Sequence, residues 1–400
     1  MRILFCTTDG SHAINGINAW LLRFLPSLTA LGHEPEVLVF PWSPEYQCTT
    51  TRLLRLAGIR TTVVYPMLYS EAGVKRCLQE IHKRMPEVFV ANMVMPALLA
   101  MPRIRAMGIP CVSVLHNDDD EYRAKASFPT DATVVISEGL ARLVPADGRI
   151  VRTIFYGTPI SSRTTHWPNN NCLRLIYHGR IAITQKQILH TAAAFTRVCK
   201  NNPGLTADIY GSGQDELALR NQLARDDAKG HVRFLGFRSP AEILELLPDY
   251  HIAVLLSDYE GLGLAILEAM SAGLVPICLA TPSGLPDIIK HGINGFFVND
   301  RSDDFSNSVN RLVYEPIMWR NLSLEARRTI EERFSSSHSA NGWHKLFQEL
   351  TQSNRTAPLV SSSLPAPLPA LVNEDIRHPG LVHAWWRRLR FFRSHGYRPW

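Results

Sequence analysis

The sequence predicts an α/β protein made of two Rossmann-like domains that face each other across a cleft. Its 400 residues exceed the size of one ordinary hydrophobic core. Short apolar segments alternate with helical stretches in both halves of the chain, which is typical of parallel sheets covered by helices. Glycine-containing loops follow several of these segments, at the positions where open parallel sheets bind ligands.

The first half begins with an apolar segment at Ile3–Cys6, and a helical pattern from Ala19 to Leu31 follows it. The apolar segment at Glu36–Phe40 then completes a β–α–β unit. We therefore expect the first domain at residues 1–165. Three more of its strands are expected, at Val88–Ala91, Cys111–Leu115 and Thr133–Ile136.

Turn-forming residues gather at 157–172, so the hinge between the domains is expected there, and the second domain is expected at 166–335. A helix at 336–351 should cross back to the first domain. A Pro/Ser-rich linker should follow at 352–376, and a basic aromatic tail at 377–400. The strands of the second domain are expected at Leu173–His178, Ala207–Tyr210, Val232–Leu235, Ile252–Leu256, Val275–Cys278 and Gly295–Val298.

The excess of positive charge is confined to the end of the chain. Basic residues number 42 against 36 acidic ones, and six of the arginines lie at 377–400, where there is no Asp or Glu. Basic and acidic residues therefore balance in the rest of the chain, which argues against a nucleic-acid-binding protein. The seven cysteines are scattered without a Cys-x-x-Cys pair, so neither a disulfide framework nor a zinc site is expected.

The most informative segment is 252–277, IAVLLSDYEGLGLAILEAMSAGLVPI. An apolar strand runs into a glycine-containing turn at 257–263, and a helix should extend from Leu264 to Ala272. The turn glycines let backbone amides approach a ligand, and the start of a helix favours an anion such as phosphate. Glu260 and Glu268 can accept hydrogen bonds from sugar hydroxyls, so a nucleotide sugar would fit. An ordinary β–α turn with solvated glutamates is the alternative.

The segment EGLGLAILEAMSAGLVPI resembles the E-x7-E signature of the family 4 glycosyltransferases, which have the GT-B fold. The resemblance covers roughly residues 1–350 and implies a retaining, metal-independent transferase. It also implies that 1–165 is the acceptor-side domain and that 166–335 binds the nucleotide sugar. Further blocks resemble the same family in the same order, among them LRLIYHGRIAITQKQILHTAAAF, DIYGSGQDELALR, TPSGLPDIIKHGINGFFV and RRTIEERFSSSHSANGWHKLFQEL.

The resemblance implies a role for each matching residue. Glu260 would hold the donor sugar near the reacting carbon, and Glu268 would accept hydrogen bonds from the ribose hydroxyls. Arg180 and Lys186 would bind the diphosphate, and His116 would face the donor sugar. The implied catalytic residues are Glu260, Arg180, Lys186 and His116, and the implied donor-binding residues are Gly16, Gly179, Gly261, Leu262, Gly263, Leu264 and Glu268.

Two further patterns are weaker. Asp118-Asp119-Asp120 could chelate a divalent cation beside a diphosphate. The cations and helix termini of the expected site already neutralise a leaving diphosphate, however, so an acidic loop is favoured and no metal or other cofactor is expected. Gly211-Ser212-Gly213 resembles the start of a dinucleotide fingerprint but is not followed by its third glycine.

The sequence therefore predicts a glycosyltransferase that moves a sugar from a nucleotide-diphosphate sugar to an acceptor hydroxyl, with retention of anomeric configuration. Polysaccharide or glycoconjugate biosynthesis for the cell envelope is the expected context. The expected partners are the nucleotide sugar and a carbohydrate or lipid-linked acceptor, not a nucleic acid. A nucleotide-sugar epimerase, a phosphorylase of the same architecture and a non-catalytic nucleotide-sugar-binding protein are the alternatives.

The expected location is the cytoplasm, because the apolar run at the start of the chain is too short for a signal peptide and no run of about 18 apolar residues occurs. The tail at 377–400 interleaves aromatic residues with arginines, which suits the surface of an anionic membrane. We therefore expect contact with the inner face of the membrane through 377–400. A tail that packs on its own domain or is disordered is the alternative.

Overall fold

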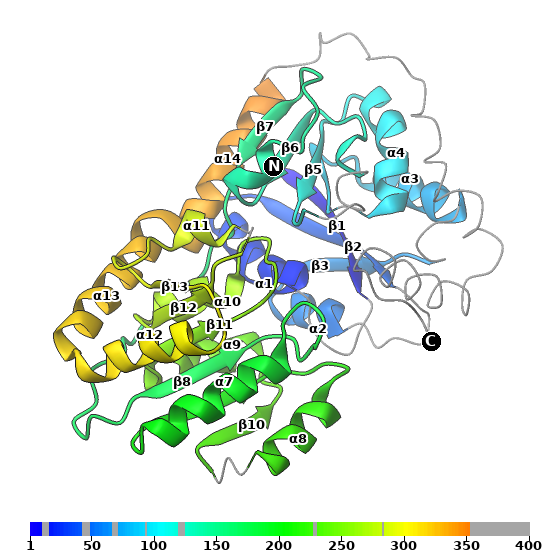
Figure 1. Ribbon diagram of the computed structural model, residues 1–400. Coiled ribbons are helices and arrows are strands. Elements are labelled where there is room, and N and C mark those ends of the chain that lie inside the picture. Colours follow the sequence, from blue (N-terminus) through cyan, green and yellow to red (C-terminus); the bar gives the residue numbers. More distant parts are fainter. Residues whose placement is uncertain are drawn as a thin grey trace.

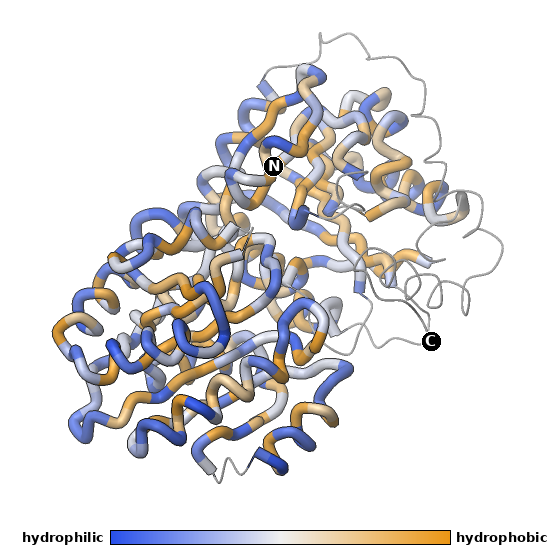
Figure 2. Tube along the Cα trace, in the orientation of Figure 1, coloured by the Kyte–Doolittle hydropathy of each residue, from blue (hydrophilic) through white to orange (hydrophobic). Residues whose placement is uncertain are grey.

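The computed structural model describes residues 1–9, 16–41, 49–65, 71–92, 94–118, 125–226, 230–281 and 284–352. These residues form two lobes, each built around one parallel sheet with helices packed against it (Figure 1). Apolar segments lie along the strands inside both lobes, whereas hydrophilic segments lie mostly on the outer helices and loops (Figure 2). Each lobe therefore has its own hydrophobic core.

The first lobe has the strand order β3-β2-β1-β4-β5-β6-β7. Its strands are β1 (Arg2–Asp9), β2 (Glu34–Pro41), β3 (Arg60–Val63), β4 (Val88–Ala91), β5 (Cys111–Leu115), β6 (Ala132–Val135) and β7 (Ile150–Thr153). Its helices are α1 (Gly16–Ala30), α2 (Thr49–Leu56), α3 (Glu71–Arg84), α4 (Met95–Ala106) and α6 (Glu138–Ala141), together with α14 (Ser336–Gln352) from the end of the described chain.

The second lobe has the strand order β10-β9-β8-β11-β12-β13. Its strands are β8 (Arg174–His178), β9 (Thr206–Tyr210), β10 (Val232–Gly236), β11 (Ile252–Leu255), β12 (Val275–Leu279) and β13 (Phe296–Val298). Its helices are α7 (Ile188–Asn201), α8 (Glu216–Arg225), α9 (Pro240–Leu246), η1 (Leu247–Asp249), α10 (Leu264–Ser271), α11 (Leu285–Ile288), α12 (Asp303–Tyr314), α13 (Pro316–Thr329) and η2 (Ile330–Phe334).

Both sheets reverse their direction of winding beside their first strand. In the first lobe β1 pairs with β2 on one side and with β4 on the other, and in the second lobe β8 pairs in the same way with β9 and β11. Open parallel sheets bind ligands at the carboxyl ends of the strands beside such a switch point. In the second lobe this position belongs to the loops after β8 and β11, which carry Arg180, Lys186 and Glu260.

The two-domain α/β class expected from the sequence is confirmed, and every strand expected from the sequence is present. β3 and β7 were not expected. They lie at the two edges of the first sheet, where their residues are only partly buried, and their sequences RTTV and IVRT contain polar residues that hide the strand pattern. Inner strands such as β4 and β12 are buried on both faces, so they read as continuous apolar runs.

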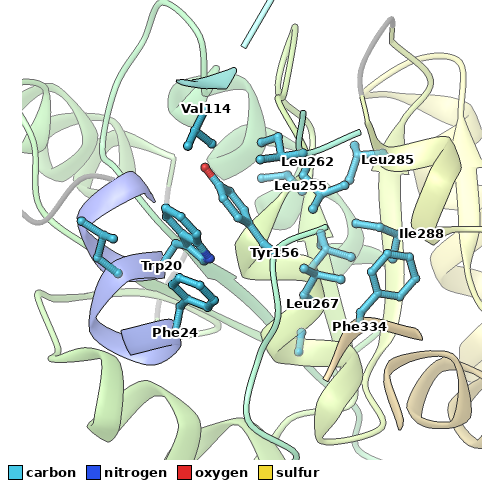
Figure 3. Packing of buried hydrophobic residues seen from close by; sticks show 14 of the residues in the cluster. Trp20, Phe24, Val114, Tyr156, Leu255, Leu262, Leu267, Leu285, Ile288 and Phe334 are labelled. Atoms are coloured by element: carbon cyan, nitrogen blue, oxygen red, sulfur yellow. The ribbon is translucent and has the colours of Figure 1, made fainter. Parts of the chain in front are cut away.

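Helix α14 leaves the second lobe and packs on α1 of the first (Figure 1). The contact is aromatic: the ring of Trp343 lies 6.0 Å from that of Trp20 and 5.6 Å from that of Phe24. The ring of Tyr156 also stacks on that of Trp20, with 5.3 Å between the ring centres. Figure 3 shows Tyr156 between Trp20 of α1 and the leucines of the second lobe, including Leu262. The buried cluster thus continues from one lobe into the other.

The linker expected at 352–376 lies outside the described residues, apart from Gln352, which ends α14. The tail expected at 377–400 lies outside them entirely. Within the described ranges, no helix combines the length and the apolar character needed to cross a membrane.

The chain passes between the lobes twice, and the two crossings touch. Thr158 N donates to Phe334 O at 3.0 Å, and Ser336 N donates to Thr158 O at 2.9 Å. Gly157 lies against the second crossing, because a Cβ placed on it would lie only 2.7 Å from Ser335 O and from Ser336 Cα. The missing side chain at Gly157 therefore allows the two crossings to lie side by side.

We expect Gly157→Ala to lower the free energy of unfolding by about 1–3 kcal/mol, because the added methyl group must displace backbone at the crossing. Thermal unfolding followed by circular dichroism measures this as a lower midpoint. Gly139→Ala is the matched control, since no atom lies within 4 Å of a Cβ at Gly139. It should leave the midpoint unchanged or raise it slightly. Equal midpoints for the two variants would contradict the close packing described here.

Candidate active site

The turn after β11 and the start of α10 have the form expected from the sequence. Gly263 precedes α10 with a φ of 88°, in the left-handed region that favours glycine. A Cβ there would also lie 2.6 Å from a side-chain methyl of Leu285. Leu264 is the first residue of the helix, and Leu262 is buried beside Leu285 in the inter-lobe cluster (Figure 3). Gly263 thus lets the start of α10 pack closely against the Leu285 side chain.

Glu260 and Lys186 meet at the carboxyl ends of β11 and β8. Lys186 Nζ lies 2.5 Å from Glu260 Oε1, and their side chains are 16% and 8% exposed. The two residues are 74 positions apart in the sequence. The sequence predicts that an acid and a cation converge here, and in the structure Glu260 and Lys186 form a direct ion pair.

Arg180 is exposed and connects to the same turn through another side chain. Its Nη2 donates to Gln185 Oε1 at 2.5 Å, and Gln185 Nε2 donates to the carbonyl of Tyr259 at 3.0 Å. Arg180 therefore lies beside the Glu260 turn, but its described contact is with Gln185 and not with Glu260. Gln185 was not expected to take part.

Glu268 is buried within α10, and its carboxylate contacts residues from two different elements. Arg23 Nη1 of α1 contacts Oε1, and His178 Nδ1 at the end of β8 lies 3.5 Å from Oε2. Burial raises the pKa of Glu268 from its usual value, and the positive charge of Arg23 opposes this rise. Arg23 belongs to the first lobe, so the two lobes are in contact at this carboxylate.

His178 is the last residue of β8 and lies beside Glu268. Its Nε2 is 3.1 Å from the carbonyl of Ala265, and its ring contacts Glu268. Burial, together with the positive charges of Arg23 and Lys186, lowers the pKa of His178 to about 4, although the hydrogen bond with Ala265 opposes the shift. The imidazole is therefore neutral at pH 7. Neither His178 nor Arg23 was predicted from the sequence. Arg23 is the one charged residue within α1, and this isolated charge is the signal that could have identified it.

His116 follows β5, and its backbone lies at the contact between the lobes. A Cβ on Gly261 would lie 2.3 Å from the His116 carbonyl oxygen, so only a glycine fits there. The ring of His116 is buried, with Nδ1 2.6 Å from the Tyr156 hydroxyl and Nε2 3.3 Å from Asn92 Oδ1. Burial lowers its pKa to about 3, so this imidazole is also neutral at pH 7.

A second pair of loops meets next to this contact. Glu138 N, at the start of α6, donates to Asp287 Oδ2 of α11 at 2.9 Å. A Cβ on Gly284 would lie 2.8 Å from Ser137 Cβ and 2.2 Å from the carbonyl oxygen of Gly261. The loops after β5 and β6 therefore pack directly on the loops after β11 and β12.

The Gly211-Ser212-Gly213 pattern has a packing role. A Cβ on Gly211 would lie 1.8 Å from Gly179 O, and one on Gly213 would lie 2.1 Å from Ile181 O. Gly179 N donates to Tyr210 O and Ile181 N to Ser212 O, which extends the pairing of β8 and β9 beyond the strands. The two glycines thus hold the Gly179–Arg180 turn in place.

The expected diphosphate loop before α1 falls outside the described residues. Residues 10–15 of this loop are not described. Gly16 is the first residue of α1, and no described atom lies within 4 Å of a Cβ placed on it. Asp118 Oδ2 lies 3.7 Å from Arg142 Nη2. Asp119 and Asp120 are not described. Among the described residues, no three His, Cys, Asp or Glu side chains are grouped so that they could hold a metal ion.

Two family models match the chain. The model described as "Glycosyltransferase Family 4" matches residues 14–154, and the model described as "Glycosyl transferases group 1" matches residues 166–329. The first match falls within the first lobe and the second within the second lobe, where Glu260, Lys186 and Glu268 lie.

Curated relatives share part of their length with the chain. The GtfA subunit of a UDP-N-acetylglucosamine–peptide N-acetylglucosaminyltransferase from Streptococcus pneumoniae is 29% identical over 222 residues, which are 54% of this chain and 43% of that protein. A glycogen synthase from Mycobacterium tuberculosis is 25% identical over 257 residues, 63% of this chain and 60% of that protein. The chain thus spans about half the length of these relatives.

Solved structures share the fold over most of the chain. Anabaena HepE in complex with UDP matches with a TM-score of 0.70 and 18% identity, over 87% of this chain and 100% of that one. The pneumococcal O-GlcNAc transferase GtfA in complex with UDP and GlcNAc matches with a TM-score of 0.67 and 14% identity, over 88% and 99% of the two chains. With its two matched regions and its two facing sheets, the chain belongs to the glycosyltransferases of family 4 and group 1 type, on the GT-B fold.

Proposed function

We propose that the protein transfers a sugar from a nucleotide-diphosphate sugar to an acceptor hydroxyl, in polysaccharide or glycoconjugate biosynthesis. The observation that carries the proposal is the placement of Glu260 and Glu268 at the switch point of the second sheet, with Lys186 paired to Glu260. Similar proteins support the donor class, because their structures contain UDP, UDP with glucose, or UDP-glucose.

The chemistry needs positive charge where the leaving group becomes negative. When the anomeric bond breaks, negative charge develops on the departing diphosphate, and Lys186, Arg180 and the start of α10 can stabilise it. Lys186 would then exchange its contact with Glu260 for the phosphate, which frees the Glu260 carboxylate for sugar hydroxyls. The buried, neutral His116 supplies no charge, so its contribution would come from its position beside Gly261.

Retention of configuration is part of the proposal. The acceptor hydroxyl would attack on the face from which the diphosphate leaves, and a phosphate oxygen would take up its proton. This route needs no protein nucleophile and no metal ion, because Lys186 and Arg180 neutralise the leaving group. Specificity for the acceptor would come from the loops of the first lobe.

The proposal predicts that nucleoside diphosphate is released only when an acceptor is present. The purified protein would be incubated with a panel of nucleotide sugars and with carbohydrate and lipid-linked acceptors, and nucleoside diphosphate and product would be measured by chromatography. Release should continue unchanged after treatment with EDTA. Nucleotide-sugar binding without transfer to any acceptor would favour a non-catalytic binding protein, and conversion of the donor sugar without an acceptor would favour an epimerase.

Glu260→Gln and Lys186→Ala should each reduce kcat by about 10²–10³-fold, because each removes a charge that acts in the transition state. Steady-state transfer rates measure this, and circular dichroism should show an unchanged fold. Exposed residues of the same type are the controls: Glu245→Gln on α9 and Lys200→Ala at the end of α7 should transfer at the wild-type rate. Near-normal turnover in both site variants would rule out this site.

We also propose that the tail at 377–400 rests on the inner membrane surface, where a lipid-linked acceptor would be found. Vesicles that contain anionic lipid should carry the full chain upward in a flotation gradient, and vesicles of neutral lipid should carry less of it. A chain that ends at residue 352 should stay at the bottom of the gradient, provided that its thermal unfolding matches that of the full chain. Equal flotation of the two chains would refute the membrane role of the tail.

A further inference from the structure

A buried ion pair joins the two lobes at the second glutamate of the site. Arg23 lies on α1 of the first lobe and Glu268 on α10 of the second, and the arginine Nη1 contacts the glutamate Oε1. Their side chains are 7% and 5% exposed, so the pair is shielded from water on both sides. An ion pair in such a place is sensitive to the loss of either partner, because the remaining charge would be buried alone.

The surroundings of Arg23 give no other reason for a charge at this position. Within Gly16–Ala30 it is the one charged residue, and its helical neighbours Trp20 and Phe24 belong to the hydrophobic core. Its Nε and Nη1 are buried and make no hydrogen bond among the described residues, so Nη1 meets the Glu268 carboxylate as an ion pair. A buried arginine is costly unless its charge is paired, and the described partner of Arg23 is Glu268.

The two glutamates of the site differ in where their cation comes from. Glu260 is paired with Lys186 of its own lobe, so this pair exists whether or not the lobes touch. Glu268 is paired with Arg23 of the other lobe, so its counter-charge depends on contact between the lobes. The neutral His178 lies next to Glu268 and supplies no positive charge.

We infer that Arg23 is a positioning residue for the donor site, which acts across the lobes by holding the Glu268 carboxylate charged and oriented when the lobes are in contact. This rests on the proposed function, in which Glu268 accepts hydrogen bonds from the donor ribose. Arg23 itself need not touch the donor. Lobe contact would thereby complete the ribose-binding end of the site.

Other charged groups around α10 do not replace Arg23. The helix packs against β11, β12, α13 and η2. β11 has no titratable side chain, and Cys278 of β12 is a buried thiol whose pKa burial raises. Arg327 of α13 donates to the carbonyl of Ser271 at the far end of the helix, and residues 331–333 of η2 are exposed. The charge of Glu268 is therefore set by burial and by Arg23.

The expected pH dependence of nucleotide binding follows from Glu268 and Arg23. Burial raises the pKa of Glu268, and Arg23 opposes the rise, so removal of Arg23 must raise this pKa further. The charged carboxylate is present above the pKa and is lost as the pH falls through it. Without Arg23, nucleotide binding should therefore be weakest at low pH and should recover as the pH rises.

The test compares Arg23→Met, Arg23→Lys, Glu268→Gln and the double variant Arg23→Met/Glu268→Gln with the wild type. UDP, ADP and GDP are titrated by calorimetry, and the one that the wild type binds most tightly is used from pH 6 to pH 9. Arg23→Met should weaken its binding on the order of tenfold at pH 6, with partial recovery at pH 9. Arg23→Lys should restore part of the affinity, and the double variant should bind no more weakly than Glu268→Gln.

Steady-state kinetics distinguish a positioning role of Arg23 in donor binding from a purely structural role. Arg23→Met should raise the donor KM and leave kcat nearly unchanged, because the ribose is remote from the reacting carbon. Weakening that is independent of pH and adds to that of Glu268→Gln would overturn the inference while the proposed function stands. A wild-type protein that binds no nucleoside diphosphate and transfers no sugar would instead overturn the proposed function, and the inference with it.

Discussion

The contact between the lobes depends on two glycines that leave room for atoms of the other lobe. Gly261 lies against the carbonyl of His116, and Gly284 lies against Ser137, at distances that admit no Cβ. Because these glycines follow β11 and β12, whereas His116 and Ser137 follow β5 and β6, the carboxyl ends of the two sheets are brought together. Parallel sheets present their ligand-binding loops at these ends. The site is therefore a property of the lobe contact as much as of either lobe.

Two acid–cation pairs and a neutral histidine gather at this contact. Lys186 pairs with Glu260 within the second lobe, Glu268 pairs with Arg23 of the first lobe, and the neutral His178 lies next to Glu268. Burial strengthens each of these interactions, since a shielded charge is less screened by water. The same burial makes each pair sensitive to the loss of one member.

The inner strands and the motif of the second lobe could be predicted because local sequence determines them. Strands such as β4 and β12 are buried on both faces and therefore consist of apolar residues, and the turn before α10 needs glycine at a left-handed position. The edge strands β3 and β7 could not be predicted in this way, because an edge position tolerates polar residues such as those of RTTV and IVRT.

The sequence by itself determined that Glu260, Glu268 and Lys186 lie on loops and a helix start at one edge of a parallel sheet, because strand and turn patterns are local. Only the tertiary structure decided which charge neutralises which acid. It placed Arg23 of the first lobe and the ring of His178 against Glu268, and it buried the ring of His116 against the Tyr156 hydroxyl. These contacts join residues that are far apart in the chain, and their distances are set by how the two lobes pack, which no local pattern records.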